Sequence, residues 1–136
     1  MNVLLLDAGV WVASKDGRDR YFESARVLAV DSDQPVAALD LTLYEVANVV
    51  GARKRRNEEA ADLCRLISAR ASGQLVAVDA ELIRRALEIA DEHNLTAYDA
   101  AYVAAARRHG WTLVSTDIAD LVPKGLAVTP DGADYP

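Results

Sequence analysis

The sequence predicts an α/β fold in which a mostly parallel sheet of about four or five short strands is flanked by helices on both faces. Short apolar runs alternate with longer segments whose apolar residues recur at helical intervals, as in strand–helix–strand units. The chain has 136 residues, which is the length of one domain. Hydrophobic residues make up 51% of it, which is enough for one core.

The first half of the chain is expected to supply two strands and three helices. Residues 3–6 form a continuous apolar run without helical spacing, which is typical of a buried strand. Residues 36–39 form a second such run. Apolar residues lie on one stripe in each expected helix, and these helices cover residues 21–28, 45–50 and 60–71.

The second half is expected to supply two helices and the remaining strands. Asp79 is a favourable N-cap for a helix that ends at His93-Asn94, and residues 97–109 form an alanine-rich helix closed by Gly110. The strands are expected at residues 75–78, 112–114 and 126–128. The domain is therefore expected to span residues 1–128, followed by a loose tail at 129–136.

Composition excludes several classes of protein. The longest apolar run, residues 100–106, is far shorter than the ~18 residues of a membrane-spanning helix, and residues 3–6 lack the features of a secretory signal, so a cytoplasmic location is expected. The single Cys64 can form neither an internal disulfide nor a cysteine zinc site. The net charge of −6 argues against a nucleic-acid partner only at first sight, because acids gathered around a divalent cation give the same balance.

Four acidic residues stand where an α/β sheet binds ligands. Asp7 follows the first strand and Asp117 follows the strand at residues 112–114, and ligand sites of open parallel sheets lie outside the carboxyl ends of the strands. Glu45 and Asp99 lie in the first turns of expected helices. We therefore expect the four carboxylates to converge at one edge of the sheet.

Each acid taken alone has a structural alternative. Thr42 and Glu45 have the spacing of a capping box, and Thr96 and Asp99 resemble one, so both acids could serve only to satisfy backbone N–H groups. By the same reasoning, Asp7 fits a turn and Asp117 fits the N-cap of a short segment after it.

The combination of acids favours a metal site over these separate roles. An acid at the end of a buried strand is costly without compensation, and no basic residue near Asp7 in sequence offers to pair with it. Carboxylates within about 4–6 Å of one another repel unless a hard cation neutralises them. Mg²⁺ has the required preference for oxygen ligands, and Mn²⁺ is an alternative. Such ions bind phosphate oxygens and acidify bound water, which is phosphodiester chemistry.

On these residues the chain resembles the PIN-domain nucleases, and among them the VapC-type toxins of bacterial toxin–antitoxin pairs. The resemblance spans nearly the whole chain, and its most specific part is the block at residues 95–106. The matching segments are Leu4-Leu5-Leu6-Asp7-Ala8, Glu45-Val46-Ala47-Asn48, residues 95–106 and residues 110–117.

The resemblance implies a metal-dependent endoribonuclease with one or two Mg²⁺ or Mn²⁺ ions in its acidic pocket. In such an enzyme a metal-bound water attacks phosphorus and leaves a 5′-phosphate and a 3′-hydroxyl. Asp7 and Asp99 are then the first ligands, and Asp117 completes the shell or holds a second ion. Glu45 positions the water or takes its proton, and Ser115 orients the water or the substrate phosphate.

The resemblance also implies partners for this chain. They are an RNA substrate, a second copy of the chain in a homodimer, and a VapB-like antitoxin whose tail fills the acidic groove; no membrane is expected. Gly9 departs from the family pattern, which often has a polar residue two places after the first acid. A supporting hydrogen bond to Asp7 is therefore not expected from residue 9.

Other features are less specific. The basic run Arg53-Lys54-Arg55-Arg56 is a candidate for contact with RNA phosphates, and its alternative is a solvated helix end. His93 and His109 lie at the ends of expected helices and are more typical of caps than of catalytic bases.

Two other families of α/β proteins also place an acid after the first strand. A haloacid-dehalogenase-type phosphatase needs a second Asp two residues after Asp7, where Gly9 stands. A response-regulator receiver needs an adjacent acidic pair and a late lysine, and neither pattern is evident. The alternative from another class is a non-catalytic PIN-like module that binds RNA or protein.

Overall fold

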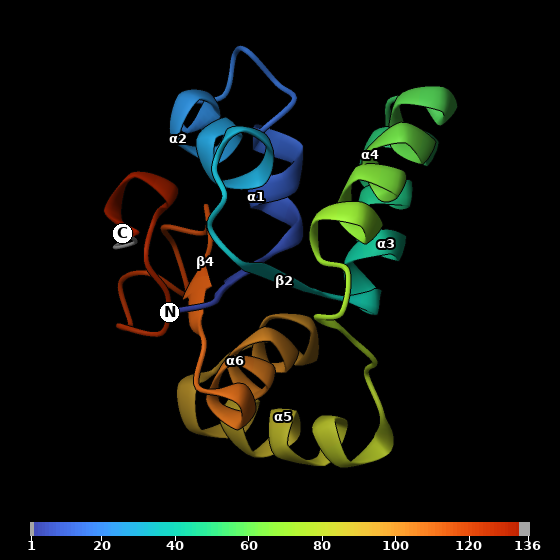
Figure 1. Ribbon diagram of the computed structural model, residues 1–136. Helices are drawn as coiled ribbons and strands as arrows, with labels where there is room; N and C mark the ends of the chain where they lie inside the picture. The colour runs from blue at the N-terminus through green and yellow to red at the C-terminus, as the bar shows by residue number, and fades with distance from the viewer. Residues whose placement is uncertain (1, 134–136) are drawn as a thin grey trace.

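A parallel sheet separates two layers of helices (Figure 1). The structure is a computed structural model and describes residues 2–133. Within this part of the chain the sheet has four strands in the order β3-β2-β1-β4, and every neighbouring pair is parallel. The strands are β1 (Leu4–Leu6), β2 (Val36–Leu39), β3 (Leu75–Val76) and β4 (Thr112–Val114). The predicted fold class is confirmed.

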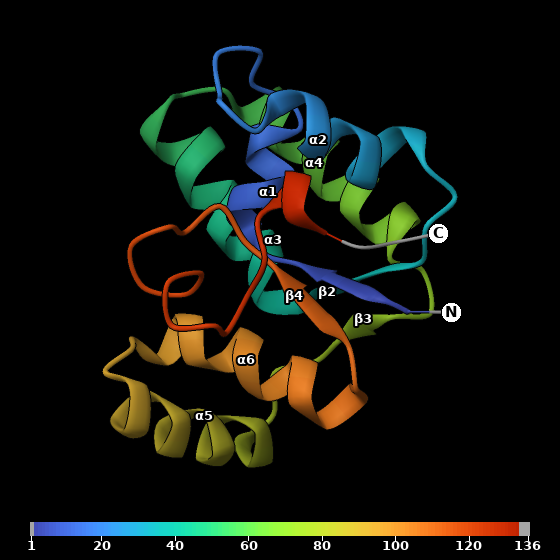
Figure 2. The ribbon, with the colours of Figure 1, turned by 90° about the vertical axis from the view of Figure 1, so that its left-hand side faces the viewer.

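The α-helices lie on both faces of the sheet, with α1 to α4 on one side and α5 and α6 on the other (Figures 1 and 2). They are α1 (Ala8–Ala13), α2 (Phe22–Arg26), α3 (Asp40–Val46), α4 (Asn57–Arg70), α5 (Ala80–His93) and α6 (Ala97–His109). Two of them continue as π-helical turns, α2 into η1 (Val27–Asp31) and α3 into η2 (Ala47–Arg53). None of these helices is long and apolar enough to cross a membrane.

Alternate side chains of β1 enter two separate hydrophobic cores. Leu4 and Leu6 pack into the core formed with α1, α2 and α4, whereas Leu5 packs into the core formed with α5 and α6. This alternation follows from the two-residue period of a strand. All three leucines are fully buried, as expected for a central parallel strand covered on both faces.

The strand order creates a crevice next to β1. From β1 the chain moves outward through β2 to β3, and it then returns to place β4 on the other side of β1. Such a reversal in strand order is where open α/β sheets bind ligands, outside the carboxyl ends of the strands. The residues that follow β1 and β4 are therefore brought to the same place.

The structure contains one helix that was not expected, and two expected strands differ from it. Helix α1 was not expected, and it begins directly after β1 with its buried side chains Val10, Trp11 and Ala13 facing the core. Strand β3 is shorter than expected, because its partner β2 ends where α3 begins and Asp40 Oδ1 accepts a hydrogen bond from the Val78 N–H at 3.1 Å. The expected fifth strand at residues 126–128 is a single parallel bridge between Val128 and Val114.

The segment after this bridge packs against the domain as far as the structure describes it. Residues Pro130–Gly132 form a short 3₁₀ helix, η3, and Pro130 is buried. Residues 134–136 lie outside the described residues. The domain boundary at residue 128 stays a prediction.

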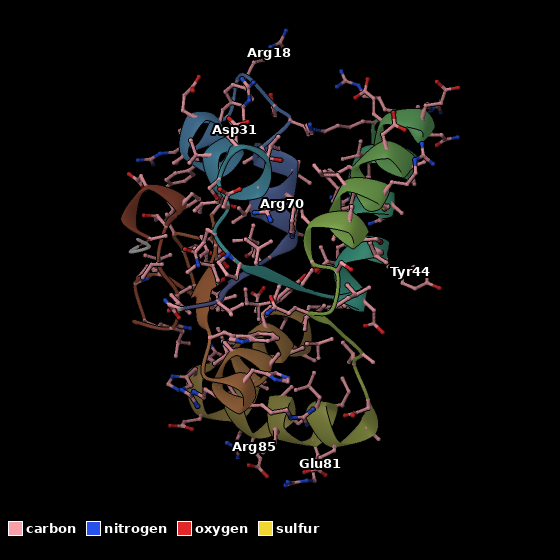
Figure 3. All side chains as sticks on the ribbon, viewed as in Figure 1. Arg18, Asp31, Tyr44, Arg70, Glu81 and Arg85 are labelled. Atoms are coloured by element: carbon pink, nitrogen blue, oxygen red, sulfur yellow. The ribbon has the colours of Figure 1, made fainter. Side chains whose placement is uncertain are left out.

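The side chain of Arg70, at the end of α4, ties the π-helical turn η1 to the rest of the molecule. Its guanidinium donates hydrogen bonds to the carbonyl oxygens of Ala29 and Leu28, both at 2.8 Å, and of Gln34 at 3.1 Å. Figure 3 shows Arg70 pointing inward toward this turn, in contrast to Glu81 and Arg85 on the outer face of α5. Carbonyl groups at the end of a helix lack hydrogen-bond donors within the helix, and the Arg70 guanidinium provides these donors.

We expect Arg70→Ala to lower the free energy of unfolding by about 2–3 kcal/mol, because a hydrogen bond from a charged donor is worth about 1.5–3 kcal/mol and the carbonyls would lose their donor. Urea denaturation measures the change. Arg65→Ala is the matched control, since Arg65 on the same helix pairs with Asp62 on the surface and such pairs contribute less than about 1 kcal/mol. Equal losses in the two variants would contradict the role given to Arg70.

Candidate active site

Asp7 combines a capping role with a position in the acidic site. It follows β1 and is the N-cap of α1, where its Oδ1 accepts a hydrogen bond from the Val10 N–H at 3.1 Å. Its Oδ2 accepts a hydrogen bond from the hydroxyl of Ser115. The Asp7 side chain is 8% exposed, so both oxygens are held in place in a largely dry environment.

Ser115 links the ends of β1 and β4. Its hydroxyl donates to Asp7 and accepts a hydrogen bond from the Asp117 N–H at 2.9 Å. Asp117 Oδ1 in turn accepts from the N–H groups of Ala119 and Asp120, both at 2.9 Å. Asp117 therefore caps the short segment that follows it, which was one of its two expected roles. Its Oδ2 takes no part in these hydrogen bonds.

Asp99 enters the site at the N-terminus of α6. Thr96 is the N-cap, and its hydroxyl accepts a hydrogen bond from the Asp99 N–H at 3.1 Å. One carboxylate oxygen each from Asp99, Asp117 and Asp120 lie within 4.8 Å of one another. Asp120 was not among the expected site residues, although it lies three positions after Asp117 in the turn that Asp117 caps.

Glu45 reaches the site from α3 and does not form a capping box. Helix α3 begins at Asp40, so Thr42 lies inside the helix. The Thr42 hydroxyl lies 2.6 Å from the hydroxyl of Tyr102, which donates to Glu45 Oε1 at 2.5 Å. The capping alternative for Glu45 is therefore wrong, because its carboxylate is held by a side chain from α6.

Burial and mutual repulsion raise the pKa values of three of the four acids. Burial is the largest cause for Asp7 and raises its pKa to about 7. The hydrogen bonds that Asp7 accepts lower this pKa, and the charges of Glu45 and Asp99 raise it again. Burial also raises the pKa of Glu45 and of Asp99. The nearby charge of Asp99 adds to the rise at Glu45, and Asp117 and Asp120 add to the rise at Asp99.

These couplings link all four expected acids in one electrostatic group. Ionising the whole group without a cation is unfavourable, because Glu45 and Asp99 raise the pKa of Asp7, Asp99 raises that of Glu45, and Asp117 raises that of Asp99. An oxygen-binding divalent cation removes this repulsion, and the donor set holds neither histidine nor cysteine. The arrangement can therefore hold a hard cation such as Mg²⁺ or Mn²⁺.

The chain matches a known protein family over most of its length. The family model described as PIN domain matches residues 4–119, a range that includes Asp7, Glu45, Asp99 and Asp117. The chain belongs to the PIN domain family. A relative of this PIN domain, Ribonuclease VapC3 from Pyrobaculum aerophilum, is 33% identical over 118 residues, which cover 84% of this chain and 88% of the relative.

Solved structures share the fold of this PIN domain. A toxin–antitoxin complex from Klebsiella pneumoniae has a TM-score of 0.70 at 18% identity and covers 93% of this chain and 97% of that chain. FitAcB from Neisseria gonorrhoeae has a TM-score of 0.69 at 20% identity and covers 96% of this chain and 99% of that chain. At these identities the likeness shows the fold alone.

Thr116 explains why this PIN domain has a glycine two positions after Asp7. A Cβ at position 9 would lie 2.4 Å from Thr116 Oγ1, which is closer than Cβ atoms approach non-bonded heavy atoms in proteins, and 3.4 Å from Asp7 Oδ1. The space that a side chain at position 9 would enter is therefore taken by the hydroxyl of Thr116. Gly9 departs from the family pattern, and the side chain of Thr116, which is distant in sequence, fills the space beside it.

We expect Gly9→Ala to destabilise the protein by about 1–2 kcal/mol, because overpacking costs about 1–3 kcal/mol and the helical preference of alanine returns less than about 1 kcal/mol. Thr116 is stiff at χ1 and does not move aside freely. Thermal or urea unfolding measures the loss. In the Thr116→Ala background the same Gly9→Ala change is expected to be neutral or stabilising, and a loss of the same size in both backgrounds would refute the clash.

Two residues of the basic run line a groove of their own. Lys54 and Arg56 line a groove of about 1020 Å³ together with Lys15 and Arg18 from the segment after α1. None of the four acids lines this groove. The role of the run in binding RNA stays a prediction.

Neither histidine belongs to the cluster of Asp99, Asp117 and Asp120 found among the described residues. His109 stacks on Trp111 with a centroid distance of 4.2 Å, at the end of α6 opposite to Asp99. Ten residues of helix separate Asp99 from His109, which corresponds to roughly 15 Å. His109 is therefore not placed as a general base. His93 ends α5, and its imidazole Nε2 lies 3.6 Å from Glu92 Oε1.

Proposed function

We propose that the protein is a divalent-cation-dependent endoribonuclease that acts as the toxin of a toxin–antitoxin pair. The observation that supports the proposal is the electrostatic coupling of Asp7, Glu45, Asp99 and Asp117, together with the Ser115 hydroxyl that bridges the ends of β1 and β4. The PIN domain family and the relative named Ribonuclease VapC3 support it.

Mg²⁺ is the proposed cofactor, with Mn²⁺ as an alternative. Asp7 and Asp99 would hold the ion directly or through water, and Asp117 would complete its shell or hold a second ion together with Asp120. The mutual approach of carboxylate oxygens from Asp99, Asp117 and Asp120 within 4.8 Å supports this assignment. When bound, the ion neutralises phosphate charge and makes water a better nucleophile at neutral pH.

The remaining side chains orient the reactants. Glu45 holds a water through its carboxylate and takes the proton as the water oxygen attacks phosphorus. The bond from phosphorus to the 3′-oxygen then breaks, and the leaving oxygen takes a proton from solvent water, which gives a 3′-hydroxyl and a 5′-phosphate. Ser115 fixes Asp7 Oδ2 and the Asp117 N–H, and so keeps the two strand-end acids in register.

An antitoxin is the proposed regulator of this site. A toxin–antitoxin complex is among the solved structures that share the fold. A cationic side chain of a VapB-like antitoxin would offset the same repulsion that a metal ion offsets, since the acids of the pocket raise one another's pKa values. A homodimer is proposed as the working assembly.

Cleavage of structured RNAs in the presence and absence of EDTA tests the proposed function. We expect cleavage with Mg²⁺ or Mn²⁺, complete loss with EDTA, and recovery when excess Mg²⁺ is added. End mapping should find 5′-phosphates and 3′-hydroxyls. Binding of RNA without cleavage under all metal conditions would instead support the non-catalytic binding module.

A further inference from the structure

Tyr102 is a buried tyrosine at the edge of the acidic site. It lies three residues after Asp99 on α6 and is 2% exposed, and residues with this spacing share one face of a helix. A phenolic hydroxyl that is removed from water needs hydrogen-bond partners. Both partners of Tyr102 come from α3 on the other side of the sheet edge.

The hydroxyl of Tyr102 lies between two side chains of α3. It donates to Glu45 Oε1 at 2.5 Å and lies 2.6 Å from Thr42 Oγ1. A phenol has one hydrogen to give, so the bond to Glu45 leaves Thr42 as the donor to Tyr102. Thr42 is fully buried and lies one helical turn before Glu45. The three side chains form a chain of hydrogen bonds that runs from the core to the partly buried carboxylate.

We propose that Tyr102 is a positioning residue of the site, which holds Glu45 Oε1 by a hydrogen bond directed by Thr42 and so leaves Oε2 as the oxygen that serves a cation or a water. This inference rests on the proposed function. Glu45 has a long side chain, and fixing such a side chain in one conformation costs conformational entropy. The Tyr102 hydroxyl provides this order in the free protein, before a ligand arrives.

A role in packing alone does not account for the hydroxyl. The ring of Tyr102 belongs to the core formed with α5 and α6, where phenylalanine would fill almost the same volume. The hydroxyl adds a polar group to this core and brings the carboxylate of Glu45 against it. Burial raises the pKa of Tyr102 well above its ordinary value, so the phenol keeps its proton as a donor at neutral pH.

The first test compares Tyr102→Phe with the parent protein. We expect Tyr102→Phe to lower kcat for RNA cleavage about 10-fold to 100-fold, the range for residues that orient metal ligands, with KM for RNA nearly unchanged. Thr42→Val is expected to lower kcat less, and Thr42→Ser to keep it near the parental value. Tyr21→Phe is the matched control, because Tyr21 is a buried tyrosine of α2 in the other layer of helices.

The second test asks whether Tyr102 acts through Glu45. In a Glu45→Gln background, Tyr102→Phe is expected to have no further effect on kcat, since the carboxylate that it orients is gone. If Tyr102→Phe lowers kcat by the same factor in both backgrounds, or leaves kcat unchanged in the parent, the proposal is wrong.

Mn²⁺ affinity separates this inference from the proposed function. Titration calorimetry with Mn²⁺ alone is expected to show weaker binding in Tyr102→Phe than in the parent, and equal binding in Glu45→Gln with and without Tyr102→Phe. A parent that binds Mn²⁺ in this way and cleaves no RNA would refute the nuclease and uphold the positioning role. Equal Mn²⁺ affinity in the parent and in Tyr102→Phe would overturn the positioning role even if RNA is cleaved.

Discussion

Asp99→Asn is expected to lower the rate of RNA cleavage by about 100-fold to 10 000-fold, the range over which loss of a cation ligand or a proton-transferring group acts. Asparagine keeps the size of the side chain, and the Thr96 hydroxyl still caps the N–H of residue 99. The change therefore removes charge and leaves the start of α6 intact. Initial rates at saturating Mg²⁺ and a melting curve of each variant give the comparison.

Asp91→Asn is the matched control for this substitution. Asp91 is an exposed residue of α5. Its substitution by asparagine is the same chemical change, and it leaves the acidic cluster unaltered. We expect Asp91→Asn to cleave RNA at the parental rate. If a folded Asp99→Asn variant cleaves RNA at the parental rate, Asp99 is not a residue of the site. Its role in the first turn of α6 would then be to stabilise the helix.

The metal-free protein is expected to lose stability as the pH rises from about 4 to 7. The pKa of Asp7 is about 7 in the folded protein and 3.8 in the unfolded reference, so the folded state binds the extra proton between these values. Below this window both states are protonated, and above it both are ionised. Full ionisation of Asp7 costs the folded state about 4 kcal/mol, taking 1.36 kcal/mol for each pKa unit.

Urea denaturation in EDTA at pH values from 4 to 8 measures this loss. The raised pKa values of Glu45 and Asp99 act in the same direction. At pH 7.5 we expect Mg²⁺ to restore stability, by about 2.7 kcal/mol at a concentration 100 times its Kd. Asp7→Asn is expected to flatten the pH dependence, and a metal-free parent whose stability rises steadily over this range would contradict the assignment.

The parts of the fold that were predicted correctly have strong local signals. Helices α5 and α6 are long, begin at the side-chain caps Asp79 and Thr96, and end at Asn94 and Gly110 with positive φ. Helix α1 has only six residues, too few for a helical period to stand out, and it follows β1 without a loop. Its N-cap, Asp7, directly follows β1, so the sequence indicated the end of a strand there and not the start of a helix.

The candidate site was only partly visible in the sequence, for a similar reason. The rule that ligands bind beyond strand ends singles out Asp7 and Asp117 without knowledge of distances. The bond from Tyr102 to Glu45 joins residues 57 positions apart, and no local pattern reports such a contact. The same holds for the close approach of Gly9 and Thr116, which depends on how β4 pairs with β1.

The pairing of the first strand with the last also has a consequence during translation. Asp7 leaves the ribosome early, but Ser115 and Asp117 reach it only when β4 has been made and has paired with β1. The nascent chain therefore lacks a complete acidic cluster through most of its synthesis. A toxin built in this way becomes active only after nearly all of its chain has been synthesised. An antitoxin can therefore bind it as soon as the acidic cluster forms.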